Sequence, residues 1–78
     1  MSLSRGEALA AAKKLLRTFE SAPDPYGRAR QIYAELRHAD GVTLGERKAI
    51  DAFGAWLDER PRPSELKLRC QGLVSRLS

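Results

Sequence analysis

Three residues in the segment RHADGVTLGERKAID, residues 37–51, have side chains that could bind a cation: His38, Asp40 and Glu46. A calcium-binding EF-hand loop needs oxygen ligands at its positions 1, 3, 5 and 12, and a glycine at position 6. With Gly41 placed at position 6, an oxygen ligand stands at only one of those four positions. A structural zinc site needs four cysteine or histidine ligands, and the chain has one residue of each type. We therefore expect no metal site here, and no other cofactor.

The one candidate thiol nucleophile is Cys70, and the one histidine that could act as its base is His38. Cys70 lies in the middle of a leucine stripe, where a buried thiol usually serves as inert packing. The neighbouring acids Asp58 and Glu59 point to different faces of a helix, so they do not form a general acid/base pair. The six glycines show neither P-loop nor dinucleotide-binding spacing. The sequence therefore indicates a protein that is not an enzyme.

A strip of alternating tyrosines and arginines is a candidate binding surface. Tyr26, Arg30, Tyr33 and Arg37 follow one another at spacings of four, three and four residues along the margin of an expected helix. Tyrosine and arginine are enriched in binding hot spots. The alternative is that the two tyrosines edge the core with their hydroxyl groups in water. The sequence leaves both interpretations open.

A further candidate binding residue is Leu68, which projects almost opposite the apolar stripe of the last expected helix. A single exposed leucine is common in monomeric proteins. Together with Val74 on the flank of the same helix, however, it indicates that this helix is covered on both sides. A second copy of the chain could supply the cover, so a homodimer is one of the expected assemblies.

Basic residues gather near the two ends of the chain. The formal net charge is +4, and the basic excess is +2 over residues 1–20 and +3 over residues 61–78. Such groups could neutralise phosphates, although ten acidic residues are mixed among fourteen basic ones. The last two expected helices are joined by RPRP, not by the short turn of a helix-turn-helix reader. The candidate nucleic-acid contacts are Lys13, Lys14, Arg17, Arg69 and Arg76.

Four short helices are expected to carry these residues, at about 5–20, 25–39, 44–60 and 64–77. Capping boxes, in which a Ser or Thr side chain and a Glu three residues later satisfy free backbone N–H groups, are expected at Ser4 with Glu7 and at Thr43 with Glu46. Gly41 suits the left-handed conformation after the second helix. No segment alternates as a half-buried strand does. The fold class is therefore all-α, a compact bundle whose third helix we expect at its centre.

The segment HADGVTLGERKAI, residues 38–50, resembles the helix, A-D-G turn and Glu-containing helix of TerB-like helical domains of the tellurite-resistance group. The resemblance covers about thirteen of the 78 residues and occurs once. Turn chemistry between two helices produces the same string by itself. We therefore carry no function over from it.

Length and composition indicate a single domain over residues 1–78 without a membrane span or signal peptide. A lone cysteine favours the cytoplasm, and ten arginines against four lysines are typical of a bacterial or phage protein from a GC-rich genome. The expected function is that of a small, basic, non-enzymatic helical protein that binds and regulates or inhibits a macromolecular partner. Another protein is the first candidate for that partner and nucleic acid the second.

Overall fold

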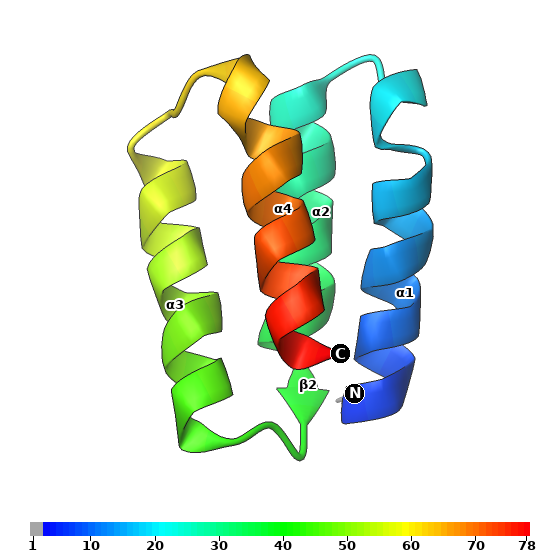
Figure 1. Ribbon diagram of the computed structural model, residues 1–78, viewed down its shortest axis with the longest axis vertical. Helices are drawn as coiled ribbons and strands as arrows, with labels where there is room; N and C mark the ends of the chain where they lie inside the picture. Colours follow the sequence, from blue (N-terminus) through cyan, green and yellow to red (C-terminus); the bar gives the residue numbers. More distant parts are fainter. Residues whose placement is uncertain (1–2) are drawn as a thin grey trace.

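Four helices run alternately up and down, so that the two chain ends lie at the same end of the bundle (Figure 1). The computed structural model describes residues 3–78. A short 3₁₀ turn, η1 (Phe19–Ser21), follows the first helix. The predicted all-α bundle of four short helices is confirmed. The helices are α1 (Arg5–Arg17), α2 (Pro25–Arg37), α3 (Leu44–Asp58) and α4 (Pro63–Leu77).

The helix starts follow the predicted capping chemistry. In α1 the backbone N–H of Glu7 donates to Ser4 Oγ at 3.2 Å, and in α3 that of Glu46 donates to Thr43 Oγ1 at 3.1 Å. Both glutamates reach back to the backbone N–H of the capping residue, which completes two capping boxes. Pro25 and Pro63 begin α2 and α4, where a missing N–H leaves no hydrogen bond unmade.

The first three helices end two or three residues earlier than the sequence predicted, and α4 ends at Leu77 as predicted. In all four helices, a side chain from another helix binds a carbonyl group of the last turn. Free carbonyls at a helix end need donors from outside the helix. Three of the four donors are arginines, so part of the basic composition serves to stabilise helix ends. The donor and acceptor pairs are Arg28 to Leu15, Arg47 to Arg37, Tyr26 to Leu57 and Arg5 to Leu77.

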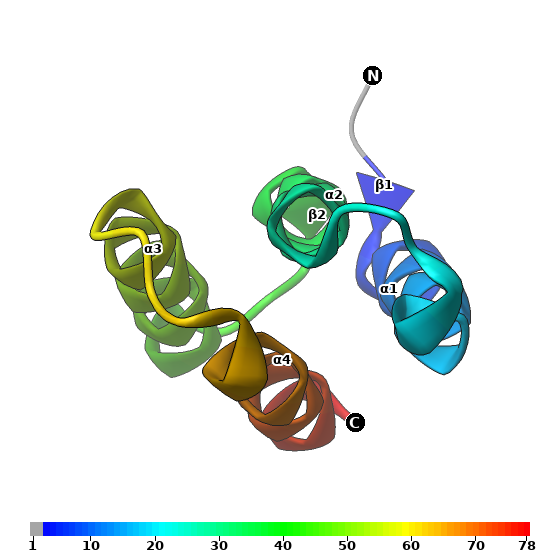
Figure 2. The same ribbon diagram turned by 90° about the horizontal axis from the view of Figure 1, so that it is seen from above.

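The bundle is built around α2 and α4, with α1 and α3 on either side of that pair (Figure 2). The expectation that the third helix forms the centre is wrong, because α3 lies at one side. The sequence showed that helix's large apolar face but not which neighbours cover it. The largest fully buried side chains are Ile32, Leu36, Ile50, Leu57, Leu66, Cys70 and Leu77.

Two very short strands were not predicted. β1 (Leu3–Ser4) pairs in parallel with β2 (Ala39–Asp40), with Leu3 opposite Ala39 and Ser4 opposite Asp40. Strands of two residues are too short to show an alternating pattern. The pairing fixes the start of α1 beside the α2–α3 connection. Gly41 has the expected left-handed φ of 81°, but it follows β2 and does not end α2, whose C-cap is His38.

Candidate binding groove between α3 and α4

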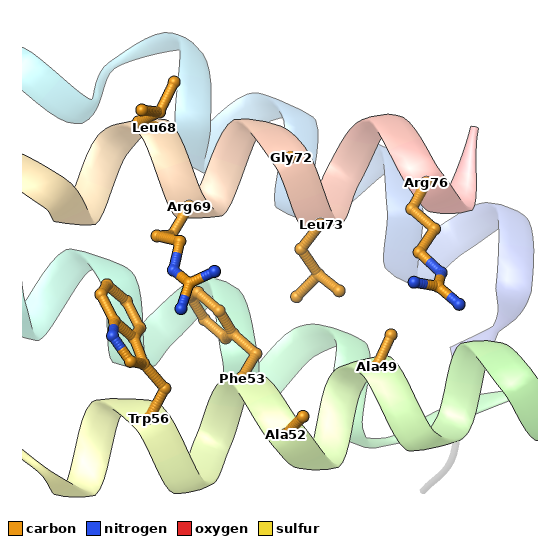
Figure 3. Close-up of a pocket in the computed structure, with 9 residues that line it drawn as sticks. All are labelled: Ala49, Ala52, Phe53, Trp56, Leu68, Arg69, Gly72, Leu73 and Arg76. Atoms are coloured by element: carbon orange, nitrogen blue, oxygen red, sulfur yellow. The ribbon is translucent and has the colours of Figure 1, made fainter.

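A groove of about 330 Å³ lies between α3 and α4 on the surface of the bundle (Figure 3). The side chains of Phe53 and Leu73 are buried and form its apolar floor. Ala49, Ala52 and Gly72 also line it, and their small size keeps the space open. The groove is therefore an apolar depression with a closed base.

The groove residues have a regular origin in the sequence. α3 supplies positions 49, 52, 53 and 56, and α4 supplies positions 69, 72, 73 and 76. Both sets have the i, i+3, i+4, i+7 spacing of one helical face. The two helices run in opposite directions, so position 56 lies across from 69 and position 49 across from 76 (Figure 3). Two antiparallel helical faces, each two turns long, thus form the walls.

One end of the groove carries an exposed cation on an aromatic face. The guanidinium carbon of Arg69 lies 4.8 Å from the centroid of the Trp56 ring. This is cation–π distance. The Trp56 ring also packs on Phe53, with 5.7 Å between the ring centroids. Arg69 is thereby held at the groove mouth by an attraction that leaves its N–H donors available.

The other end of the groove carries a second arginine, Arg76. Arg69 and Arg76 are both exposed, and in residues 3–78 no acidic side chain lines the groove. Their guanidinium groups project from α4 toward α3 in Figure 3. The depression is therefore apolar along its length and positively charged at both ends.

Leu68 stands on the rim of the groove and is 71 % exposed. Its side chain points away from α3 in Figure 3, as the helical spacing predicted. Val74 differs from the expectation, because it is buried within the chain at 5 % exposure. Other residues of the same chain cover Val74. Of the two residues that indicated a cover on both sides of α4, only Leu68 is exposed.

Three members of the tyrosine and arginine strip bind α3. The hydroxyl of Tyr26 donates to the carbonyl oxygen of Leu57 at 2.8 Å. Arg30 forms an ion pair with Asp58 at 2.9 Å.

The third member, Tyr33, packs against Phe53, with 6.4 Å between the ring centroids, and lies over Gly54. Arg37, the fourth member, is exposed at the end of α2, and its carbonyl group accepts a hydrogen bond from Arg47. The structure therefore uses most of this strip to join α2 to α3.

The predicted nucleic-acid residues fall on different sides of α4. Lys13 and Arg17 of α1 line a shallow depression of about 370 Å³ together with Lys67 of α4. Arg69 and Arg76 line the groove on the α3 side instead. Lys14 is exposed and lies outside the residues that line either depression. The five residues thus do not form one continuous basic surface.

Two of the three residues that the sequence analysis considered and rejected as cation ligands, Glu46 and His38, have structural roles in the bundle. Arg5 donates to both carboxylate oxygens of Glu46, at 2.7 and 3.3 Å, and the backbone N–H of Thr43 donates to one of them at 2.9 Å. The hydrogen bond from Arg5, and then that from Thr43, lower the pKa of Glu46 to about 2. His38 follows the last residue of α2 as its C-cap. Within residues 3–78, no group of three or more His, Cys, Asp or Glu side chains is placed to hold a metal ion.

Cys70 lies in the core and is fully buried. Desolvation raises the pKa of its thiol to about 12. A thiol in this state is a poor nucleophile, since the thiolate is the reactive form. Its predicted role as core packing is confirmed by its burial.

No helix in the described part of the chain is both long and apolar enough to span a membrane. No protein family, curated protein or solved structure matches the chain. The function is therefore inferred from the residues of the molecule itself, above all from those that line the α3–α4 groove.

Proposed function

We propose that this is a small non-enzymatic helical protein that binds a segment of another protein in the groove between α3 and α4, and that it regulates or inhibits that partner by occupying the segment. The observation that carries the proposal is the apolar floor of Phe53 and Leu73 between two exposed arginines, with Leu68 71 % exposed on the rim. Apolar anchor positions surrounded by polar groups are the usual composition of a protein-binding surface.

The shape of the groove favours a helical segment. Its walls are two helical faces of seven-residue span, which corresponds to about 10 Å along the helix axis. An incoming amphipathic helix could place its apolar face between them in the manner of other helix-in-groove complexes. The small side chains at positions 49, 52 and 72 favour close approach of its backbone. We expect this binding in a reducing compartment such as the cytoplasm, where a free thiol persists.

Site-specific photo-crosslinking in producing cells tests the proposal. A photoreactive amino acid replaces Ala52, an exposed residue that lines the groove, in one variant and Gln31, an exposed residue of α2, in a matched control. The expected result is one dominant protein adduct from position 52 and none from position 31, followed by identification and reconstitution of the purified pair. Equal adducts from both positions, or none from position 52, would contradict the proposal.

Nucleic acid is the second candidate partner, because the structure brings the α1 residues Lys13 and Arg17 to the same depression as Lys67. Three basic side chains around one depression could neutralise adjacent phosphates. Lys67 also forms an ion pair with Glu20, which offsets part of that charge. The apolar floor of the other groove, which phosphates would not use, favours the protein partner.

Fluorescence anisotropy of a random-sequence duplex at about 50 and 200 mM salt tests the second candidate. Micromolar binding that collapses at the higher salt, and that is lost in the double variant Lys13→Gln/Arg17→Gln, would support it. The matched double variant Arg69→Gln/Arg76→Gln changes the other face of α4. Loss of duplex binding only in this second variant would place phosphate contacts in the α3–α4 groove and count against the protein-binding proposal.

A further inference from the structure

The charges at the ends of the groove are not neutralised within the bundle. Within residues 3–78, the ion pairs join Arg5 to Glu46, Arg30 to Asp58 and Lys67 to Glu20, and they include neither groove arginine. Arg69 contacts the uncharged face of Trp56, and in that same part of the chain no carboxylate lines the groove. An occupant with negative charge at both ends would therefore be complementary to this surface.

A second copy of the chain does not meet that requirement. A two-fold contact through the groove would place the same surface of each copy against the other. Arg69 and Arg76 would then meet the arginines of the partner copy across an apolar floor, and like charges in an interface oppose association. The groove is therefore suited to a different chain.

The spacing of the arginines defines what that chain must carry. Arg69 and Arg76 are seven residues apart on α4, so their origins are separated by about 10.5 Å along the helix axis. Two carboxylates seven positions apart on an incoming helix have the same separation and lie close to the same face. The residues between them on that face, at i+3 and i+4, would lie over the apolar floor.

Gly72 lies between the two arginines on α4, at the point that the i+3 and i+4 side chains of an incoming helix would reach. A Cβ at position 72 would have no heavy atom within 4 Å, so nothing in the bundle requires a glycine there. A glycine inside a helix is less favourable than alanine by about 1 kcal/mol. Its absent side chain leaves room for the apolar residues of an occupant.

Resting on the proposed function, we infer that the groove selects an acidic amphipathic helix. Its recognition elements are carboxylates at i and i+7, bound by Arg69 and Arg76, and apolar side chains at i+3 and i+4, seated over Gly72 between Phe53 and Leu73. The class of partner is thus a protein segment of acidic and apolar residues in helical spacing.

Three labelled peptides of about 16 residues, long enough to form a helix, test the inference with the full-length protein. The first has Glu at i and i+7 with Leu at i+3 and i+4. The second has Gln in place of both Glu residues, and the third has its second Glu moved to i+5, on the opposite side of the helix. Binding is measured by anisotropy at about 50 and 500 mM salt.

We expect the first peptide to bind about five- to tenfold more tightly than the other two at the lower salt, since two exposed charge pairs contribute modestly. The preference should shrink at the higher salt and disappear in the variant Arg69→Gln/Arg76→Gln. Both substitutions lie on exposed side chains, and circular dichroism checks that the variant remains folded.

The variant Gly72→Phe, which fills the groove, separates this inference from the proposed function. Equal binding of the Glu and Gln peptides, abolished by Gly72→Phe, would keep the groove as a binding site and overturn its selection of acidic helices. Failure of all three peptides to bind at about 1 mM protein, or binding that Gly72→Phe leaves unchanged, would contradict both.

Discussion

The ring of Tyr33 occupies the space that a side chain at position 54 would need. A Cβ built on Gly54 would lie 2.5 Å from Tyr33 Cζ and 2.6 Å from Tyr33 Oη. Gly54 is buried in α3, and Tyr33 reaches it from α2. Tyr33 also packs on Phe53, so it belongs to the packing between α2 and α3 that supports the floor of the groove.

Replacement of Gly54 by alanine should therefore destabilise the protein, because overpacking of a core costs about 1–3 kcal/mol and the helix propensity of alanine offsets only about 0.5–1 kcal/mol of that cost. Gly72→Ala is the matched control in α4, where a Cβ meets open space. It should stabilise the protein by about 0.5–1 kcal/mol through helix propensity. Urea unfolding followed by the fluorescence of Trp56, the one tryptophan, measures both. Equal stability of the two variants would show that Tyr33 moves aside without penalty.

Tyr26→Phe should reduce stability by about 1 kcal/mol, because it removes the hydrogen bond to the Leu57 carbonyl at the end of α3. The same variant should bind a groove partner with unchanged affinity. Denaturation and a binding titration together check this expectation. A loss of binding without a loss of stability would instead return the tyrosine and arginine strip to first place as the binding surface.

Acid should weaken the fold through Glu46. The pKa of this carboxyl is lowered in the folded protein to about 2, from an ordinary value of 4.5, chiefly by the hydrogen bond from Arg5. A lowered pKa means that the carboxylate stabilises the folded state above about pH 4.5, and that this contribution is lost as the pH falls toward 2.

The pKa of Glu20 is also lowered, by Lys67, so Glu20 adds to the acid sensitivity of the protein. A comparison of wild type with Glu46→Gln isolates the contribution of Glu46, because Glu20 is present in both proteins. Thermal unfolding between about pH 7 and pH 2 should show the difference in stability between the two proteins shrinking through the acidic range. A difference that stays constant with pH would contradict the assigned pKa.

Cys70 should react with thiol reagents only after the bundle opens. The thiol is fully buried, and desolvation raises its pKa to about 12. At about pH 8, only about one thiol in ten thousand would be ionised in the folded protein. Labelling followed by mass spectrometry should therefore be slow in buffer and fast in urea, and rapid labelling of the folded protein would argue against a closed core.

The sequence was a good guide to local structure. Both capping boxes and the left-handed φ of Gly41 depend on residues within a few positions of each other, and these features are confirmed. The helix ends were less predictable. In α1, for example, the carbonyl of Leu15 is bound by Arg28 from another helix, and no local pattern shows such a partner.

The candidate site depended on relations that a single helix does not reveal. Periodicity placed Tyr26, Arg30 and Tyr33 on one margin, but it could not show that Asp58 and Gly54 would face them. It likewise placed the two groove arginines seven residues apart beside an apolar stripe. Periodicity could not predict the antiparallel pairing of α3 with α4, which turns two separate helical faces into one groove.

The most direct test of groove binding is the affinity of the cross-linked and identified partner for three proteins: wild type, Gly72→Phe and Gly6→Phe. Both glycines lie in helices, and a Cβ at either position meets open space, so neither substitution creates a clash at its Cβ. Only position 72 lines the groove. We expect Gly72→Phe to weaken binding at least about tenfold, or about 1.4 kcal/mol, and Gly6→Phe to leave it unchanged. Equal affinity of all three proteins would contradict the groove as the binding site.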